Sequence, residues 1–87
     1  MSKIAIIGNY PPRQCGIATF TKDLNDGFKE IGVSTAVVAM NDGLNRYDYS
    51  DDVVFEIEQN VLSSYIHAAQ FLNTNAFDAV ILQHFRG

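Results

Sequence analysis

A strand, a proline-containing loop and the start of a helix follow one another within the first twenty residues, and this succession constrains the fold most strongly. Residues 4–7 form an unbroken apolar run, as a parallel strand covered on both faces requires. Gly8 ends the run, and the Pro11-Pro12 pair denies the backbone both helical entry and ladder hydrogen bonds. Gly16 then lets a ligand or a neighbouring backbone approach the first turn of the following helix. In open α/β sheets such an element forms a ligand site beyond the carboxyl ends of the strands.

The composition indicates one small globular domain over residues 1–87. An apolar fraction of 47% and a charged fraction of 18% are ordinary for a folded chain. The net charge of −4, without a Lys/Arg cluster, argues against a nucleic-acid partner. The single cysteine, Cys15, excludes an internal disulfide framework and suits a reducing compartment. No apolar run approaches the ~18 residues of a membrane span. We therefore expect a cytoplasmic domain with no transmembrane segment.

Apolar periodicities alternate along the rest of the chain. A helix that ends at Gly32 is predicted after the loop, with an inward stripe of Ile17, Phe20, Leu24, Phe28 and Ile31. Further strands are predicted over residues 34–40, 53–57 and 79–82. A second helix over 60–75 is expected to end at a left-handed Asn75 and to turn inward Val61, Leu62, Tyr65, Ile66, Ala69 and Leu72.

The order β-α-β-β-α-β predicts an α/β fold with a partial Rossmann-like parallel sheet in the strand order 3-2-1-4. Right-handed crossovers place the last strand beside the first, and no later segment covers its outer edge. An uncovered apolar edge strand is an aggregation template. We therefore interpret the chain as the opening of a larger domain and expect self-association through the open sheet edge.

Several blocks of sequence resemble the N-terminal domain of bacterial family-4 glycosyltransferases. The blocks are NYPPRQCGIATFTKDL, VVAMNDGLNRYDYSDDVVFEIEQN, SSYIHAAQFLN and DAVILQH, and the resemblance extends from Lys3 to His84. Its most specific parts are YPPRQCGIATFT and the collinear spacing of YDY, FEI and LQH. In the family the last block usually continues into Glu, an aromatic residue and a glycine-rich loop, whereas here it reads Gln83-His84-Phe85-Arg86-Gly87.

The resemblance implies a retaining enzyme of the GT-B architecture, in which two Rossmann-like domains close over a nucleotide-sugar. On this resemblance, residues 1–87 would be the acceptor-side fragment, an incomplete half of the N-terminal domain, and the second, donor-binding domain would be absent from them. Such enzymes transfer a hexose from a nucleotide-sugar to a sugar or glycan acceptor, and no further cofactor is implied. Because the family's catalytic carboxylate lies largely in the second domain, we expect no transferase activity from the chain alone.

The resemblance also assigns site residues. Gly16 matches the glycine of the turn near the donor diphosphate, and the positive end of a helix favours an anion. Arg13 can pair with a phosphate or an acidic acceptor group; the alternative is a solvated loop arginine. His84 is the candidate catalytic and donor-sugar contact, a hydrogen-bonding group rather than a nucleophile; the alternative is an exposed strand-end histidine. His67 reads as a surface residue, and no metal site is expected because ligands at suitable spacing are lacking.

Two other readings remain open from the residues themselves. A stand-alone flavodoxin-like module would bind a small anionic ligand at the Gly16 turn. A receiver domain is disfavoured because Asn9 and Tyr10, rather than an acidic pair, follow the first strand. The second reading is a non-functional gene remnant that folds poorly. The sequence lacks GxGxxG and GKS/T motifs, so it gives no support to dinucleotide-binding or P-loop functions.

Overall fold

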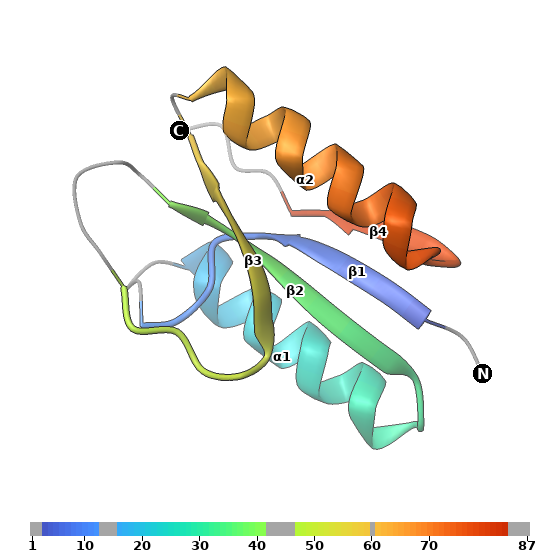
Figure 1. The fold of residues 1–87 in the computed structure, drawn as a ribbon. Helices are drawn as coiled ribbons and strands as arrows, with labels where there is room; N and C mark the ends of the chain where they lie inside the picture. Colours follow the sequence, from blue (N-terminus) through green and yellow to red (C-terminus); the bar gives the residue numbers. More distant parts are fainter. Residues whose placement is uncertain (1–2, 13–15, 42–46, 60, 84–87) are drawn as a thin grey trace.

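A computed structural model of the chain shows an α/β fold, in which a parallel sheet lies between two helices (Figure 1). The structure describes residues 3–12, 16–41, 47–59 and 61–83. Its elements are β1 (Lys3–Gly8), α1 (Gly16–Glu30), β2 (Ser34–Asn41), β3 (Val53–Glu58), α2 (Leu62–Asn75) and β4 (Ala79–Leu82). The four strands of the described chain are all parallel and have the order β3-β2-β1-β4. The predicted fold class and strand order are therefore confirmed.

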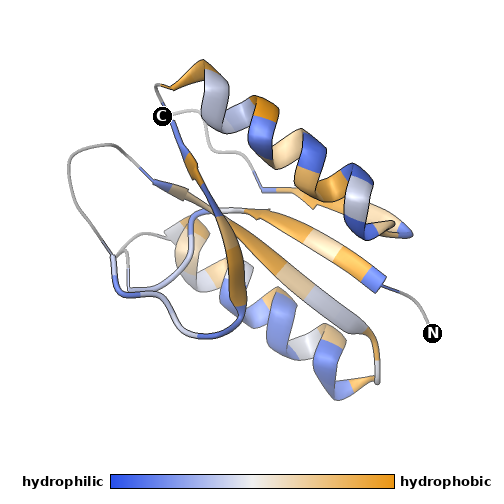
Figure 2. Cartoon of the chain, viewed as in Figure 1, coloured by the Kyte–Doolittle hydropathy of each residue, from blue (hydrophilic) through white to orange (hydrophobic). Residues whose placement is uncertain are grey.

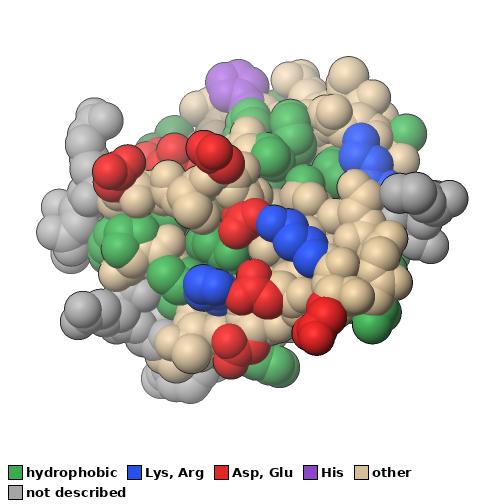
Figure 3. Space-filling model, turned by 90° about the horizontal axis from the view of Figure 1, so that it is seen from below, with side chains coloured by type: hydrophobic (Ala, Val, Ile, Leu, Met, Phe, Trp, Pro, Cys, Tyr) green, Lys and Arg blue, Asp and Glu red, His purple; other side chains and the backbone are tan. Residues whose placement is uncertain are grey.

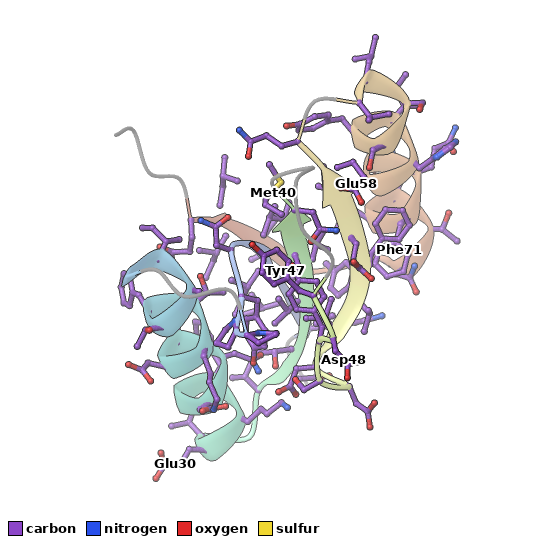
Figure 4. All side chains as sticks on the ribbon, turned by 90° about the vertical axis from the view of Figure 1, so that its left-hand side faces the viewer. Glu30, Met40, Tyr47, Asp48, Glu58 and Phe71 are labelled. Atoms are coloured by element: carbon purple, nitrogen blue, oxygen red, sulfur yellow. The ribbon has the colours of Figure 1, made fainter. Side chains whose placement is uncertain are left out.

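The two faces of the sheet carry separate apolar clusters because successive side chains of a strand point to opposite faces. On the α1 face, Val37 and Ala39 of β2 form a buried cluster with Tyr10. On the α2 face, Val38 of β2 packs with Ile57 and Ala68. Figure 4 shows α1 on one side of the strands and α2 on the other. The central strands β1 and β2 are thus covered on both faces, as their unbroken apolar sequences predict.

The inward face of α1 differs from the predicted stripe. The buried residues of the helix are Ala18, Thr21 and Asn25, whereas Phe20 is 54% exposed and Ile31, beyond the last helical residue, is 74% exposed. Small side chains let the helix approach the sheet closely, and Thr21 satisfies its hydroxyl by donating to the carbonyl of Ile17 at 2.8 Å. The stripe prediction was therefore wrong by one position around the helix.

The predictions for α2 need two corrections. Ala68 is the buried residue of the helix, and Phe71 and Leu72 pack half-buried against the cluster that contains β3. Most residues predicted to point inward are exposed, namely Val61, Leu62, Tyr65, Ile66 and Ala69. The left-handed terminator is Ala76, with φ of 51°, and not Asn75. The Asn75 side chain instead donates to the carbonyl of Phe71 at 2.7 Å, one turn back. The corresponding prediction for α1 is confirmed, since Gly32 has φ of 84°.

The strand β4 lies at an edge of the sheet and pairs with β1 among the described strands. Val80 and Leu82 stand in register with Ala5 and Ile7, so they face the same side of the sheet as α2. Their exposed fractions are 49% and 64%, because α2 packs mainly over β3. Figure 2 shows hydrophobic residues along this strand. The predicted apolar edge is present in the structure.

In the parts of the chain that the structure describes, neither helix combines the length and apolar character needed to cross a membrane.

Candidate functional site

β1 and β4 are neighbouring parallel strands, and their carboxyl ends lie side by side at the carboxyl-terminal end of the sheet. This place differs from the outer side of β4. The amide of Gln83, directly after β4, donates to the carbonyl of Ile7 at 2.8 Å. A Cβ built on Gly8 would lie 2.9 Å from the Cβ of Gln83 and 3.1 Å from Oγ1 of Thr21. The chain entering the loop after β1, the chain leaving β4 and the second turn of α1 therefore pack against one another. We call this place the β1–β4 edge and define it by Gly8, Thr21 and Gln83.

Gly16 is the first residue of α1 and is exposed. It precedes Thr21 by five residues, so the start of the helix lies roughly 7.5 Å further along the helix axis, beyond the β1–β4 edge. A Cβ on Gly16 would meet nothing within 4 Å. No contact within the described chain therefore requires a glycine at this position.

The other predicted site residues are not placed. Arg13, the candidate phosphate ligand, and His84, the candidate catalytic residue, lie outside the described residues, as does Cys15. Gln83 is the residue before His84 and belongs to the β1–β4 edge. The structure thus brings Gln83, the neighbour of the predicted site residue His84, into contact with Gly8, which lies five residues before Arg13.

The structure shows a close approach of two chain segments at Gly8, which was not expected from the sequence, whereas the approach of a ligand to Gly16 stays a prediction. Gly8 is buried at the end of a central strand, where any larger residue would displace the chain after β4. A glycine that ends a continuous apolar strand is the sequence signal for such crowding. That signal was read only as the end of the strand.

A second feature that the sequence analysis missed is a hydrogen-bond network around Tyr10. The Tyr10 hydroxyl donates to Asp52 Oδ2 at 3.1 Å, and Asn25 Nδ2 donates to the Tyr10 oxygen at 3.4 Å. Lys29, near the end of α1, forms an ion pair with the same carboxylate. Asp52 is only partly exposed, whereas its neighbour Asp51 is exposed.

The ionisation of this network follows from its surroundings. Burial raises the pKa of Tyr10 to about 12, and the negative charge of Asp52 acts in the same direction. The hydrogen bond from Lys29 holds the pKa of Asp52 below its ordinary value, and the hydrogen bond from Tyr10 contributes to this. At neutral pH the network therefore contains a neutral phenol, a carboxylate and an ammonium group.

The carboxyl ends of β2 and β3 carry a separate polar cluster. Asn41, the last residue of β2, is 4% exposed and accepts a hydrogen bond from the Tyr49 hydroxyl at 2.5 Å. Its amide nitrogen donates to Glu56 at 2.9 Å and to Glu58 at 3.2 Å. Figure 4 shows Tyr47 and Glu58 in this part of the molecule. These contacts hold the segment that precedes β3 against the sheet.

The two lysines of α1 are both paired with aspartates. Figure 3 shows Lys and acidic side chains next to one another, and the pairs are Lys22–Asp26, at 2.6 Å, and Lys29–Asp52. His67 is exposed on α2, as the sequence predicts. Within the described ranges, no three His, Cys, Asp or Glu side chains are grouped closely enough to hold a metal ion.

No protein-family model, curated protein or solved structure matches this chain.

Proposed function

We propose that this chain is the N-terminal, acceptor-side part of a retaining glycosyltransferase, which transfers a hexose from a nucleotide-sugar to a sugar or glycan acceptor. The proposal starts from the resemblance of YPPRQCGIATFT and LQH to family-4 enzymes. One observation supports it in particular: Thr21, the last residue of the first block, and Gln83, in the second block, both pack against Gly8 at the β1–β4 edge. Open α/β sheets bind ligands at the carboxyl ends of their strands.

The proposed roles follow from the chemistry of each residue. The start of α1 offers a partial positive charge to the donor diphosphate, and Gly16 leaves space for its approach. Arg13 pairs with phosphate through its guanidinium group. His84 hydrogen-bonds the donor sugar. The donor nucleotide and the catalytic carboxylate belong to a second domain in this proposal, so residues 1–87 alone bind ligand without transferring sugar.

An NMR titration of the isotopically labelled chain tests ligand binding at this edge. UDP-glucose is the probe, and flavin mononucleotide and inorganic phosphate are the comparators. We expect millimolar UDP-glucose to shift the amide signals of Gly8, Gly16 and Gln83, while signals of the exposed α2 residues remain unchanged. Binding of flavin mononucleotide or phosphate in preference to UDP-glucose would instead favour a stand-alone anion-binding module.

The gene offers an independent test of the same proposal. We expect the nucleotide sequence that follows the codon for Gly87 to encode, in some reading frame, a glycine-rich loop and a second Rossmann-like domain. Unrelated sequence in all frames would argue against a glycosyltransferase and for an independent module.

A further inference from the structure

The Tyr10 network connects three parts of the chain that are distant in sequence. Tyr10 belongs to the segment between β1 and α1, Asn25 to the body of α1, and Asp52 to the residues that enter β3. Asp52 is 42 residues from Tyr10, and the backbone carbonyl of Asp52 also accepts from the amide of Val37 in β2 at 3.1 Å. The hydroxyl of Tyr10 is therefore anchored to a residue that is itself fixed on the sheet.

The position of Tyr10 leaves little freedom for its backbone. The residue is 1% exposed and its ring packs with Val37 and Ala39. A buried phenol needs hydrogen-bond partners, and here the partners are the carboxylate of Asp52, in the turn before β3, and the amide of Asn25 on α1. Tyr10 stands two residues after Gly8 and six before Gly16, so fixing its side chain fixes the path of the chain away from β1.

We propose that Tyr10 is a positioning residue, which holds residues 9–12, directly after β1, in place for a ligand at the β1–β4 edge. The identity of the ligand rests on the proposed function, whereas the anchoring of the segment does not. Asp52 acts through Tyr10, and Lys29 keeps the Asp52 carboxylate ionised and oriented. A charged pair at the far end of α1 thereby supports the proposed site.

Backbone order parameters from ¹⁵N relaxation test the anchoring directly. In the unaltered chain we expect values of about 0.85 at Asn9 and Tyr10, and in Tyr10→Phe a decrease below about 0.6 at both amides. Tyr65→Phe is the matched control, because it also removes one tyrosine hydroxyl. That hydroxyl lies on α2 and donates to the carbonyl of Gln59 at 2.8 Å. The control should leave Asn9 and Tyr10 unchanged.

A second variant keeps the test valid if Tyr10→Phe does not fold. Asp52→Ala removes the acceptor and leaves the Tyr10 ring in its apolar cluster, and it should loosen the same two amides. The double variant should loosen them no more than either single variant, since both remove one interaction. Order parameters that stay high in every folded variant would overturn the proposal.

The affinity for UDP-glucose distinguishes positioning from a purely structural role. We expect the dissociation constant of UDP-glucose to rise roughly tenfold in Tyr10→Phe, because a smaller fraction of the molecules has the residues after β1 in the conformation that binds the ligand. A loosened segment with unchanged affinity would overturn the positioning role. If UDP-glucose does not bind to the unaltered chain, the proposed function fails, and the order parameters alone decide whether Tyr10 anchors the segment.

Discussion

Gly8 and Gln83 are packed so closely that no side chain fits at position 8: a Cβ there would lie 2.9 Å from the Cβ of Gln83. The contact joins the ends of two parallel strands, and Oγ1 of Thr21 lies 3.1 Å from the same built atom. The geometry of the β1–β4 edge therefore depends on the absence of a side chain at position 8, together with the hydrogen bond from the Gln83 amide to the carbonyl of Ile7.

The first prediction concerns this contact. Gly8→Ala should lower the free energy of unfolding by about 1–3 kcal/mol, because the added methyl group overpacks a buried position. Urea unfolding measures the change. Gly27→Ala is the matched control, because in the described ranges its built Cβ meets no neighbouring element within 4 Å. We expect about 0.5–1 kcal/mol of stabilisation from this substitution in the exposed helix. Equal effects of the two substitutions would contradict the crowding at Gly8.

A second prediction concerns how the stability of the fold depends on pH. The pKa of Asp52 is lowered in the folded chain, chiefly by the hydrogen bond from Lys29, so folding favours the ionised carboxylate. The stability from this shift is present above the unfolded pKa of about 3.9 and is lost as the pH falls through the folded value. The difference in unfolding free energy between the unaltered chain and Asp52→Asn should thus be constant near neutrality and shrink in acid. Asp51→Asn, at the exposed neighbour, controls for loss of one charge. A difference independent of pH would refute the role of the ionised carboxylate.

A third prediction concerns the exposed edge. β4 carries no charge, and Val80 and Leu82 expose about half or more of their surfaces. We expect the isolated chain to associate at high micromolar concentration in sedimentation experiments, since such an edge accepts further strands. Val80→Lys should reduce the association, whereas Ile31→Lys, a control at a residue 74% exposed just after α1, should not. A stable monomer with a cooperative melt would show that the edge does not drive association.

A fourth prediction concerns Gly16 and requires a hybrid enzyme, in which residues 1–84 replace the corresponding segment of an active family-4 glycosyltransferase. Gly16→Val in the hybrid should raise the donor KM or lower kcat by blocking the approach of the phosphates. The fold should persist, because the built Cβ meets no neighbouring element within 4 Å among the residues that the structure describes. Unchanged kinetics would leave Gly16 with a role in turn geometry alone.

The order of the strands was predictable from the sequence, whereas the faces of the helices were not. Strand order follows from apolar runs separated by helical segments, because crossovers are right-handed. For α1 the longest apolar residues suggested the stripe, but the contact with the sheet is made by Ala18 and Thr21, whose small size permits close packing. Apolar residues lie on several sides of α2, so periodicity alone did not single out Ala68 as the buried position.

The site was predictable only where it follows from the order of the strands. The ends of β1 and β4 were expected to share an edge, and they do. The tie between Tyr10 and Asp52 could not be found in the same way, because it requires the residues before β3 to fold back over the α1 face. Nothing in the local sequence around Asp52 distinguishes it from its exposed neighbour Asp51.

Sugar transfer by the hybrid enzyme tests the proposed function most directly. The product's anomeric configuration is followed by NMR, with the donor and acceptor of the parent transferase. We predict that the hybrid transfers hexose with retention, that His84→Ala reduces kcat, and that residues 1–87 alone give no product. A hybrid that folds and binds donor but transfers no sugar, or transfers it with inversion, would contradict the proposed glycosyltransferase function.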